Sequence, residues 1–352
     1  MLRTQQKKIG GFIGLDLPLA KPVGRSAWDV MTKGGVQTFC AANAREVLAN
    51  LLTGFAPSRI WYPAYCCPEI ALQPKGIERH FYPVGDDLQP DTKWLKGRLA
   101  SGDAVLAINY FGAPASAEFT DLTRARPDIL WIEDCSQALD AGEAWGDWRF
   151  FSPRKIFGVP DGGIGVCHNA TKTMRNALTF PAQSNLTVAE KLLPLLWRME
   201  DGAEDLNELW YSSYQNAETL AADLVRHDVT VGMSGLTRRL LDAIDADAAI
   251  AARFANATLI HDNIPHEIRL WQTLPHPPLL GYPVRLHQRD AIAKKLSEDG
   301  IFCAIHWRAL PVESATFPDE HRLSRSLLTL PCDQRYSPDD MFKIIDTIAK
   351  LL

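Results

Sequence analysis

The chain lacks the apolar run that a membrane helix requires, since no stretch approaches about 18 consecutive apolar residues. It also lacks an excess of basic residues, with 37 Lys and Arg against 42 Asp and Glu and a net charge of -5. Nucleic-acid binders usually carry a basic patch or excess, so this balance argues against that class. Any anionic ligand must therefore be held by a local site.

Signals of export and of metal binding are missing as well. The N-terminal segment starts with basic residues, but Asp16 interrupts its apolar part too early for a signal peptide. The seven cysteines are odd in number and scattered, and the neighbours Cys66 and Cys67 do not have the C-x-x-C spacing of a zinc or redox site. The histidines at 261, 266 and 276 fit no helical metal pair. We expect a cytoplasmic protein with reduced thiols and no bound metal.

The first two thirds of the chain alternate short β-rich runs with helical stretches, and 352 residues suffice for one large and one smaller domain. This alternation predicts a mainly parallel sheet covered on both faces. Helical stretches are expected at Ala44–Leu52 and Ala117–Ala125. The expected strands are Val36–Phe39, Arg59–Tyr62, Arg79–Tyr82, Ala104–Asn109, Ile129–Ile132 and Ile164–Cys167.

The last third changes character. It is helical in pattern from about residue 185 to 262, and a Pro-rich segment, 265–283, follows as a linker. A smaller αβ domain then comprises a strand at 281–286, a helix at 290–299, a strand at 301–305 and a final helix at 338–352. We therefore expect a large domain over residues 1–262 and a small C-terminal domain over residues 263–352.

One stretch carries candidate chemistry. A hydrophobic strand ends in Glu133 and Asp134, and Lys155 follows before a Pro-Asp-Gly-Gly turn. In open α/β sheets, ligands bind beyond the carboxyl ends of the strands, where Asp134 would lie. Pyridoxal-phosphate (PLP) chemistry needs a lysine amine, a carboxylate facing the ring nitrogen and a helix N-terminus for the phosphate. Asn43, as a helix cap with Ala44 after it, supplies such a terminus.

Each of these residues taken singly is more often structural. A Glu-Asp pair at a strand end is commonly a helix cap, and a lysine near Gly-Gly is commonly a solvated surface residue. Their order and spacing together favour the catalytic interpretation over the structural one. The pair His306 and Trp307, at the end of another expected strand, fits packing better than catalysis.

Over most of its length the sequence resembles the DegT-type sugar aminotransferases, fold type I PLP enzymes that act on nucleotide-linked keto sugars. The specific matches are the Glu-Asp-x-x-Gln-Ala block at 133–138 and the Phe-Ser-x-x-Lys block at 151–155 with Asp-Gly-Gly after it. Supporting matches are Trp61–Cys67, Asn109–Gly112, Gly300–Trp307 and Leu330–Asp333. The resemblance implies an α/β fold with a mainly parallel seven-stranded sheet in a three-layer large domain and a smaller C-terminal αβ domain.

Carried over by position, the resemblance makes Lys155 the Schiff-base lysine and proton shuttle, and pairs Asp134 with the pyridinium nitrogen. Gln137 would lie near the phenolic oxygen of the cofactor and Tyr65 would stack on its ring. Ala44 and Arg45 occupy the positions of a phosphate-binding Gly-Thr pair. Ser152 would bind the phosphate or the lysine loop.

The sequence also departs from the family. Phe150 stands where the family usually has Ser, Arg45 replaces Thr, and the segment 232–239 poorly matches the part that the neighbouring subunit contributes. A guanidinium at position 45 could take over phosphate contacts, or it could point outward into a surface ion pair.

The resemblance implies an aminotransferase with PLP as cofactor, an amino donor such as glutamate or glutamine, a keto-sugar acceptor and a homodimer with Met233–Arg239 at the shared site. Two alternatives stay open: another PLP reaction, such as dehydration or decarboxylation, and a non-catalytic PLP-binding regulator. Retention of Lys155 favours transamination, because some sugar-dehydrating relatives lack the lysine.

Overall fold

The structure is a computed structural model that describes residues 8–18, 20–71, 76–175, 179–199, 211–217, 219, 230–276 and 278–352. Residues 1–7 of the N-terminal segment, part of the helical stretch expected between 185 and 262, and Pro277 lie outside the described residues. Within the described part of the chain, no helix combines the length and the apolar character needed to cross a membrane.

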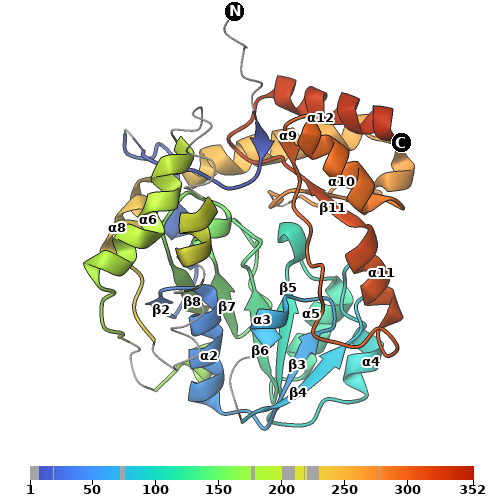
Figure 1. Cartoon of the computed structure of the whole chain (residues 1–352). Helices are drawn as coiled ribbons and strands as arrows, with labels where there is room; N and C mark the ends of the chain where they lie inside the picture. Colours follow the sequence, from blue (N-terminus) through green and yellow to red (C-terminus); the bar gives the residue numbers. More distant parts are fainter. Residues whose placement is uncertain are drawn as a thin grey trace, which may run out of the picture.

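A seven-stranded sheet forms the centre of the molecule (Figure 1). Its strand order is β2-β8-β7-β6-β5-β3-β4, and the four pairings from β7 to β4 are parallel, while β8 runs antiparallel to both of its neighbours. The expected α/β architecture with a mainly parallel seven-stranded sheet is thus confirmed. The strands are β2 (Gln37–Ala41), β3 (Arg59–Pro63), β4 (Glu78–Tyr82), β5 (Ala104–Ile108), β6 (Leu130–Asp134), β7 (Trp148–Phe151) and β8 (Gly163–Cys167).

Strand β7 is the sheet strand that the sequence did not predict. Arg149 lies in the middle of its aromatic run and hides the pattern of a buried strand. The structure explains this residue: Arg149 faces Glu133 of β6 in register and binds its carboxylate at 3.1 and 3.2 Å. Paired in this way, a guanidinium can be buried inside a sheet.

Apolar side chains cover both faces of the sheet, as a three-layer arrangement requires. In β8, Cys167 belongs to the core on the side of α2, while Ile164 and Val166 belong to a second core that includes residues of α1 and α8. This alternation follows from the two-residue period of a strand. The helices around the sheet are α1 (Ala27–Thr32), α2 (Ala44–Phe55), α3 (Pro68–Ala71), α4 (Thr92–Lys96), α5 (Ala117–Ala125), α6 (Asn185–Met199) and α8 (Gly235–Ala243).

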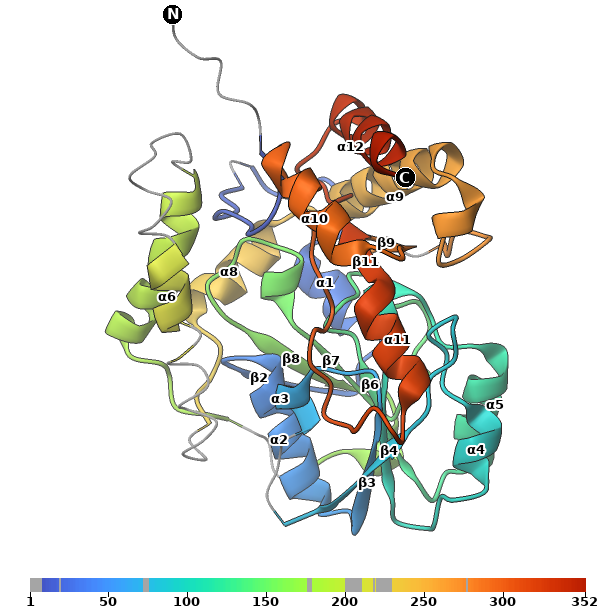
Figure 2. The ribbon, with the colours of Figure 1, turned by 45° about the vertical axis from the view of Figure 1, so that its right-hand side comes forward.

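The C-terminal elements gather beyond one end of the sheet, where both views show α9, α10 and α12 (Figures 1 and 2). A third core joins them, and it includes Ile9 from the N-terminal part of the chain. The elements of this third core are α9 (Ala246–Asn263), α10 (Arg289–Glu298), α12 (Pro338–Leu351), β9 (Tyr282–Arg285), β10 (Ile301–Phe302) and β11 (Leu327–Leu330). Helix α11 (Pro318–Ser326) instead contributes Leu323 to the core on the side of α2.

Two small sheets complete this region. Strand β9 pairs antiparallel with β11, and β1 (Ile9–Gly10) pairs in parallel with β10. The strand expected at 301–305 is therefore shorter than predicted, because its partner β1 has only two residues; Ala304 makes an isolated bridge to Thr329 instead. Neither β11 nor α11 was predicted from the sequence.

Candidate active site

The candidate residues follow the carboxyl ends of neighbouring strands. Asp134 is the last residue of β6, the chain turns after β7 into the 3-10 helix η2 (Pro153–Lys155), and Tyr65 comes two residues after β3. Since β3, β6 and β7 run in the same direction, these side chains collect at one edge of the sheet. Asp134 thus lies at the carboxyl end of its strand, where the sequence led us to expect it.

Asp134 is buried at that edge. One carboxylate oxygen accepts a 2.8 Å hydrogen bond from the Ser136 backbone N–H, and its backbone carbonyl accepts one from the Asn109 N–H at 3.0 Å. Burial raises the pKa of Asp134, while the Lys155 ammonium and the bonds from Ser136 oppose that rise. The two predicted catalytic residues are therefore close enough for each to act on the charge of the other.

Lys155 ends η2 and borders a cavity. Its backbone N–H donates to the Ser152 carbonyl at 3.0 Å, which fixes the turn that carries it. The side chain is accessible from the cavity, although protein surrounds it on the other sides. Burial lowers the pKa of the Lys155 ammonium, and nearby Arg154 and Arg45 act in the same direction, while Asp134 opposes them. A lysine in this setting can supply a neutral amine.

Aromatic side chains form one wall near the lysine. The Tyr65 ring lies 5.3 Å from Trp307 and 5.7 Å from Tyr110, between centroids. The Tyr65 hydroxyl donates to the His306 carbonyl, which ties the end of β3 to the C-terminal region. Gln137 is also buried, and its side-chain oxygen accepts a 2.6 Å hydrogen bond from the Phe111 N–H.

Helix α2 starts as predicted. The Asn43 side chain caps it by accepting the Glu46 N–H at 3.1 Å, and Ala44 is the first helical residue. Arg45 follows and forms an ion pair with Glu69, whose side chain is largely exposed. The charge of Arg45 nevertheless reaches Lys155. The guanidinium is thus paired with Glu69 while its charge acts on Lys155.

The cavity has a volume of about 380 Å³, and residues from the N-terminal and C-terminal parts of the chain line it. Gly10, Phe12 and Phe302 line it beside residues from the C-terminal region, and Lys155 borders it from the sheet side. Among its charged residues, Arg335 and Asp333 bind each other at 2.7 Å. A space of this size, lined by apolar groups and a few polar ones, is typical of a small-molecule site.

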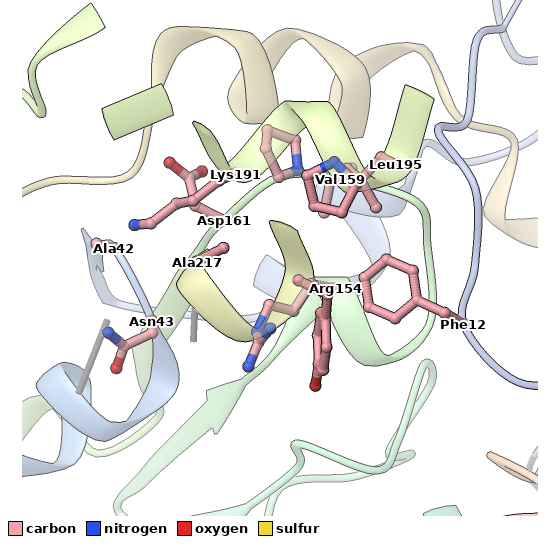
Figure 3. A pocket seen from close by; sticks show the side chains of 12 residues that line it. Phe12, Ala42, Asn43, Arg154, Val159, Asp161, Lys191, Leu195 and Ala217 are labelled. Atoms are coloured by element: carbon pink, nitrogen blue, oxygen red, sulfur yellow. The ribbon is translucent and has the colours of Figure 1, made fainter. Parts of the chain in front are cut away.

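A second and much smaller pocket, of about 30 Å³, lies next to it (Figure 3). Arg154 lines both spaces, and in Figure 3 its guanidinium lies on the side where Asn43 is found. Asp161 borders the small pocket and binds the Ser234 hydroxyl at 3.0 Å and the Thr237 hydroxyl at 2.5 Å. This pocket is too small for a cofactor, and its polar groups join α8 to the loop after Lys155.

The segment Met233–Arg239, expected to serve a neighbouring subunit, makes contacts within its own chain. Ser234 caps α8, and the Arg238 guanidinium lies 3.6 Å from the centre of the Trp28 ring. Its contribution to a second subunit stays a prediction.

Sequence reasoning overlooked two groups near Lys155, Cys67 and Arg154, and one buried acid in the first turn of α2, Glu46. Cys67 lines the cavity and interacts electrostatically with Lys155, and burial raises the pKa of its thiol. Arg154, directly before the lysine, falls at a variable position of the Phe-Ser-x-x-Lys block, and it lines the cavity. Glu46, in the first turn of α2, is buried, and burial raises its pKa to about 7. The place of Cys67 after β3 was a usable signal, whereas nothing local distinguishes a buried Glu46 from an ordinary first-turn acid.

The described residues contain no group of three or more His, Cys, Asp or Glu arranged to hold a metal ion.

Comparison with known proteins places the fold. No family model matches the sequence. No curated protein matches it. Solved structures do match. A DegT DnrJ EryC1 StrS aminotransferase from Brucella abortus is 18% identical over 94% of this chain and 91% of that chain, with a TM-score of 0.61. DesV from S. venezuelae is 17% identical over 89% of this chain and 84% of its own, with a TM-score of 0.63, and the sugar aminotransferase CalS13 from Micromonospora echinospora is 16% identical over 94% and 93% of the two chains, with a TM-score of 0.61. The chain shares the fold of these proteins over nearly its whole length.

Proposed function

We propose that the protein is a PLP-dependent aminotransferase that transfers an amino group from an amino acid, glutamate or glutamine, to a nucleotide-linked keto sugar. The observation that carries the proposal is the placement of Asp134 at the end of β6 and of Lys155 after β7, within electrostatic reach of each other, with Lys155 bordering a cavity of about 380 Å³. The shared fold with sugar aminotransferases supports it. Length, charge balance and fold also fit a cytoplasmic enzyme that acts on small molecules.

The residues present fit PLP. A lysine with a lowered pKa borders the cavity, an acidic side chain lies within electrostatic reach of it, and a capped helix begins nearby. Lys155 would hold the cofactor covalently, and Asp134 would face its ring nitrogen. Gln137 would lie near its phenolic oxygen, and Tyr65 would stack on its ring. The start of α2 at Ala44 and Arg45, together with Ser152, would hold the phosphate.

When bound, the cofactor would supply an electron sink that stabilises negative charge on the carbon next to the amine. The protein supplies the rest. Asp134, whose carboxylate accepts a hydrogen bond from the Ser136 N–H, would face the ring nitrogen and keep it protonated. Lys155, whose ammonium is disfavoured by burial, would take up a proton and return it at the reacting carbon. The aromatic wall of Tyr65 and Trp307 would exclude water from that side.

The test is direct. The purified protein with added PLP should be yellow, borohydride should abolish the visible absorption, and mass spectrometry should find the reduced adduct on Lys155. Lys155→Ala should remove the adduct and reduce transamination by several orders of magnitude, because the covalent anchor and the proton carrier are the same group.

Lys294→Ala, a change on the C-terminal helix α10, is the matched control and should leave both signals unchanged. An adduct on any other lysine would contradict the assignment. A screen of amino donors on the yellow protein then separates transamination from other PLP reactions and from simple binding.

A further inference from the structure

The turn that carries Lys155 is held from outside the central sheet. The carbonyl oxygen of Ile156, the next residue, accepts a hydrogen bond of 3.1 Å from the Arg253 guanidinium and one of 3.0 Å from the Gln334 side-chain amide. Arg253 lies on α9, and Gln334 lies between β11 and α12. A carbonyl oxygen has two lone pairs, so these two donors occupy both of them. The peptide after the lysine is therefore fixed by two residues that lie far along the chain.

Gln334 also orients the guanidinium. Its side-chain oxygen accepts a hydrogen bond from Nε of Arg253 at 2.6 Å, while its amide nitrogen donates to Ile156. The partners fix this orientation of the amide, because a guanidinium only donates and a carbonyl oxygen only accepts. Arg253 and Gln334 thus act on the Ile156 carbonyl as one unit.

Arg253 is buried, with 1% of its surface exposed. Its guanidinium also donates to the backbone carbonyls of Leu279 and Leu280, at 3.1 and 3.0 Å. In the described part of the chain, its hydrogen-bond partners are all neutral. Burying a cation among neutral groups is costly, and an apolar side chain of similar volume is often as stable or more so. Stability alone therefore does not account for an arginine at this position.

A fixed backbone matters for Lys155 because its side chain is long and flexible. On the N-terminal side, the Lys155 N–H donates to the Ser152 carbonyl at 3.0 Å, and the Ile156 N–H donates to the Pro153 carbonyl at 2.9 Å. The bonds to the Ile156 carbonyl add an anchor on the C-terminal side. The side chain then enters the cavity from a fixed point, and a displacement of about 1 Å at a reacting group can slow a reaction about 100-fold.

We propose that Arg253 is a positioning residue that, together with Gln334, holds Lys155 in place beside the cavity through the Ile156 carbonyl. Resting on the proposed function, this assignment makes the covalent capture of PLP by Lys155 depend on Arg253. The non-covalent binding of the cofactor, in contrast, should not depend on it.

Two compounds separate these steps in the cofactor-free, full-length protein. PLP has an aldehyde that Lys155 can capture, whereas pyridoxamine 5'-phosphate has an amine in its place and binds without a bond to the lysine. Borohydride trapping followed by mass spectrometry measures the rate at which the adduct on Lys155 forms. Titration measures the dissociation constant of pyridoxamine 5'-phosphate. A merely structural role would impair both quantities together.

The main variant is Arg253→Lys, which keeps the positive charge but replaces the fork of donors by a single ammonium. We expect the rate of PLP capture to fall about 10- to 100-fold, while the dissociation constant of pyridoxamine 5'-phosphate stays within about 3-fold of the native value. Gln334→Glu keeps an acceptor for Nε of Arg253 but removes the amide that donates to Ile156. It should slow capture about 2- to 12-fold, the value of one neutral hydrogen bond.

Arg289→Lys is the matched control. Arg289, on α10, is also buried, and its guanidinium donates to the backbone carbonyls of Ser324 and Leu327 at 3.0 and 2.8 Å. Its replacement removes a buried fork of donors that does not contact the Lys155 turn. The capture rate and the dissociation constant of pyridoxamine 5'-phosphate should both stay at their native values.

Several outcomes would overturn the assignment. Equal losses of capture and of pyridoxamine 5'-phosphate binding would show a structural role, as would a loss in Arg289→Lys as large as that in Arg253→Lys. Native capture rates in both Arg253→Lys and Gln334→Glu would remove the pair from the positioning of Lys155. If Arg253→Lys does not fold, the capture rate of Gln334→Glu decides. Absence of any adduct on Lys155 in the native protein would instead overturn the proposed function itself.

Discussion

At the scale of single residues, Arg45 places a charged side chain in the first turn of α2, where the family that the sequence resembles has a neutral threonine. Its guanidinium pairs with Glu69, yet its charge reaches Lys155. An exposed pair of this kind contributes only about 0–1 kcal/mol, so stability alone gives little reason for an arginine here. A helix start with an added guanidinium is suited to a phosphate.

Arg45→Ala should weaken PLP binding about 10- to 150-fold, the range for a hydrogen bond to a charged group. Binding of pyridoxal, which lacks the phosphate, should not change, and titration of the cofactor-free protein with both compounds measures the difference. Arg124→Ala, which removes an exposed pair with Asp121, is the control. Equal dissociation constants for PLP in the native protein and Arg45→Ala would assign Arg45 to the surface pair alone.

At the scale of the element, helix α2 contains a titrating acid in its first turn. Glu46 accepts a hydrogen bond from the Asn43 amide at 2.9 Å and one from the Val231 N–H at 3.2 Å, which ties α2 to the segment before α8. Burial raises its pKa from 4.5 to about 7, although these bonds and Lys191 oppose the rise. The folded protein therefore binds a proton here that the unfolded chain releases.

The sign of the pH effect follows from this. The stabilisation that protonated Glu46 provides is fully present below about pH 4.5 and is lost as the pH rises through about 7. Because Glu46→Gln cannot ionise, its free energy of unfolding relative to the native protein should increase between pH 5 and pH 8, by an amount on the order of 3 kcal/mol. Urea unfolding at the two pH values measures this change.

Glu118→Gln, in the first turn of α5 but exposed, serves as the matched control and should have the same effect at both pH values. A stability difference for Glu46→Gln that does not vary with pH would show that Glu46 keeps one charge state throughout.

The sequence predicted those elements whose signals are local. Helix α5 has the predicted bounds, and Asn43 caps α2 as expected. Both could be predicted because the capping residue and the spacing of the apolar residues lie within one short stretch of sequence. Strand β7 escaped prediction because Arg149 depends on Glu133, a partner on another strand. The same limit applies near the site: Lys155 and Asp134 carry a motif, whereas the buried position of Glu46 depends on contacts such as that with Val231, far away in the sequence.

At the scale of the whole molecule, a surface suited to a second copy lies on α6. Leu186, Leu193, Leu196 and Met199 expose 71%, 40%, 38% and 48% of their surface. Several large apolar groups on one helix are costly to leave in water, and covering them in a dimer would recover that cost. We expect the homodimer that the family resemblance implies to cover this surface.

Light scattering should therefore give twice the mass of the chain, and the double variant Leu193→Asp, Leu196→Asp should raise the dimer dissociation constant at least 10-fold, since it places charges in an apolar contact. Leu352→Asp, an exposed change at the far C-terminal end, should leave the mass unchanged. A native protein that is monomeric and fully active would exclude a site shared between subunits.

The pairing of β1 with β10 has a consequence for the order in which the molecule can be made. Ile9 and Gly10 leave the ribosome long before their partners Ile301 and Phe302 are synthesised. The strands of the central sheet from β2 to β8 can associate during synthesis. The cavity wall that Gly10 and Phe12 supply forms only when β1 pairs with β10, which lies almost 300 residues later in the sequence. Binding competence should thus appear only once Ile301 and Phe302 have been synthesised and have paired with β1.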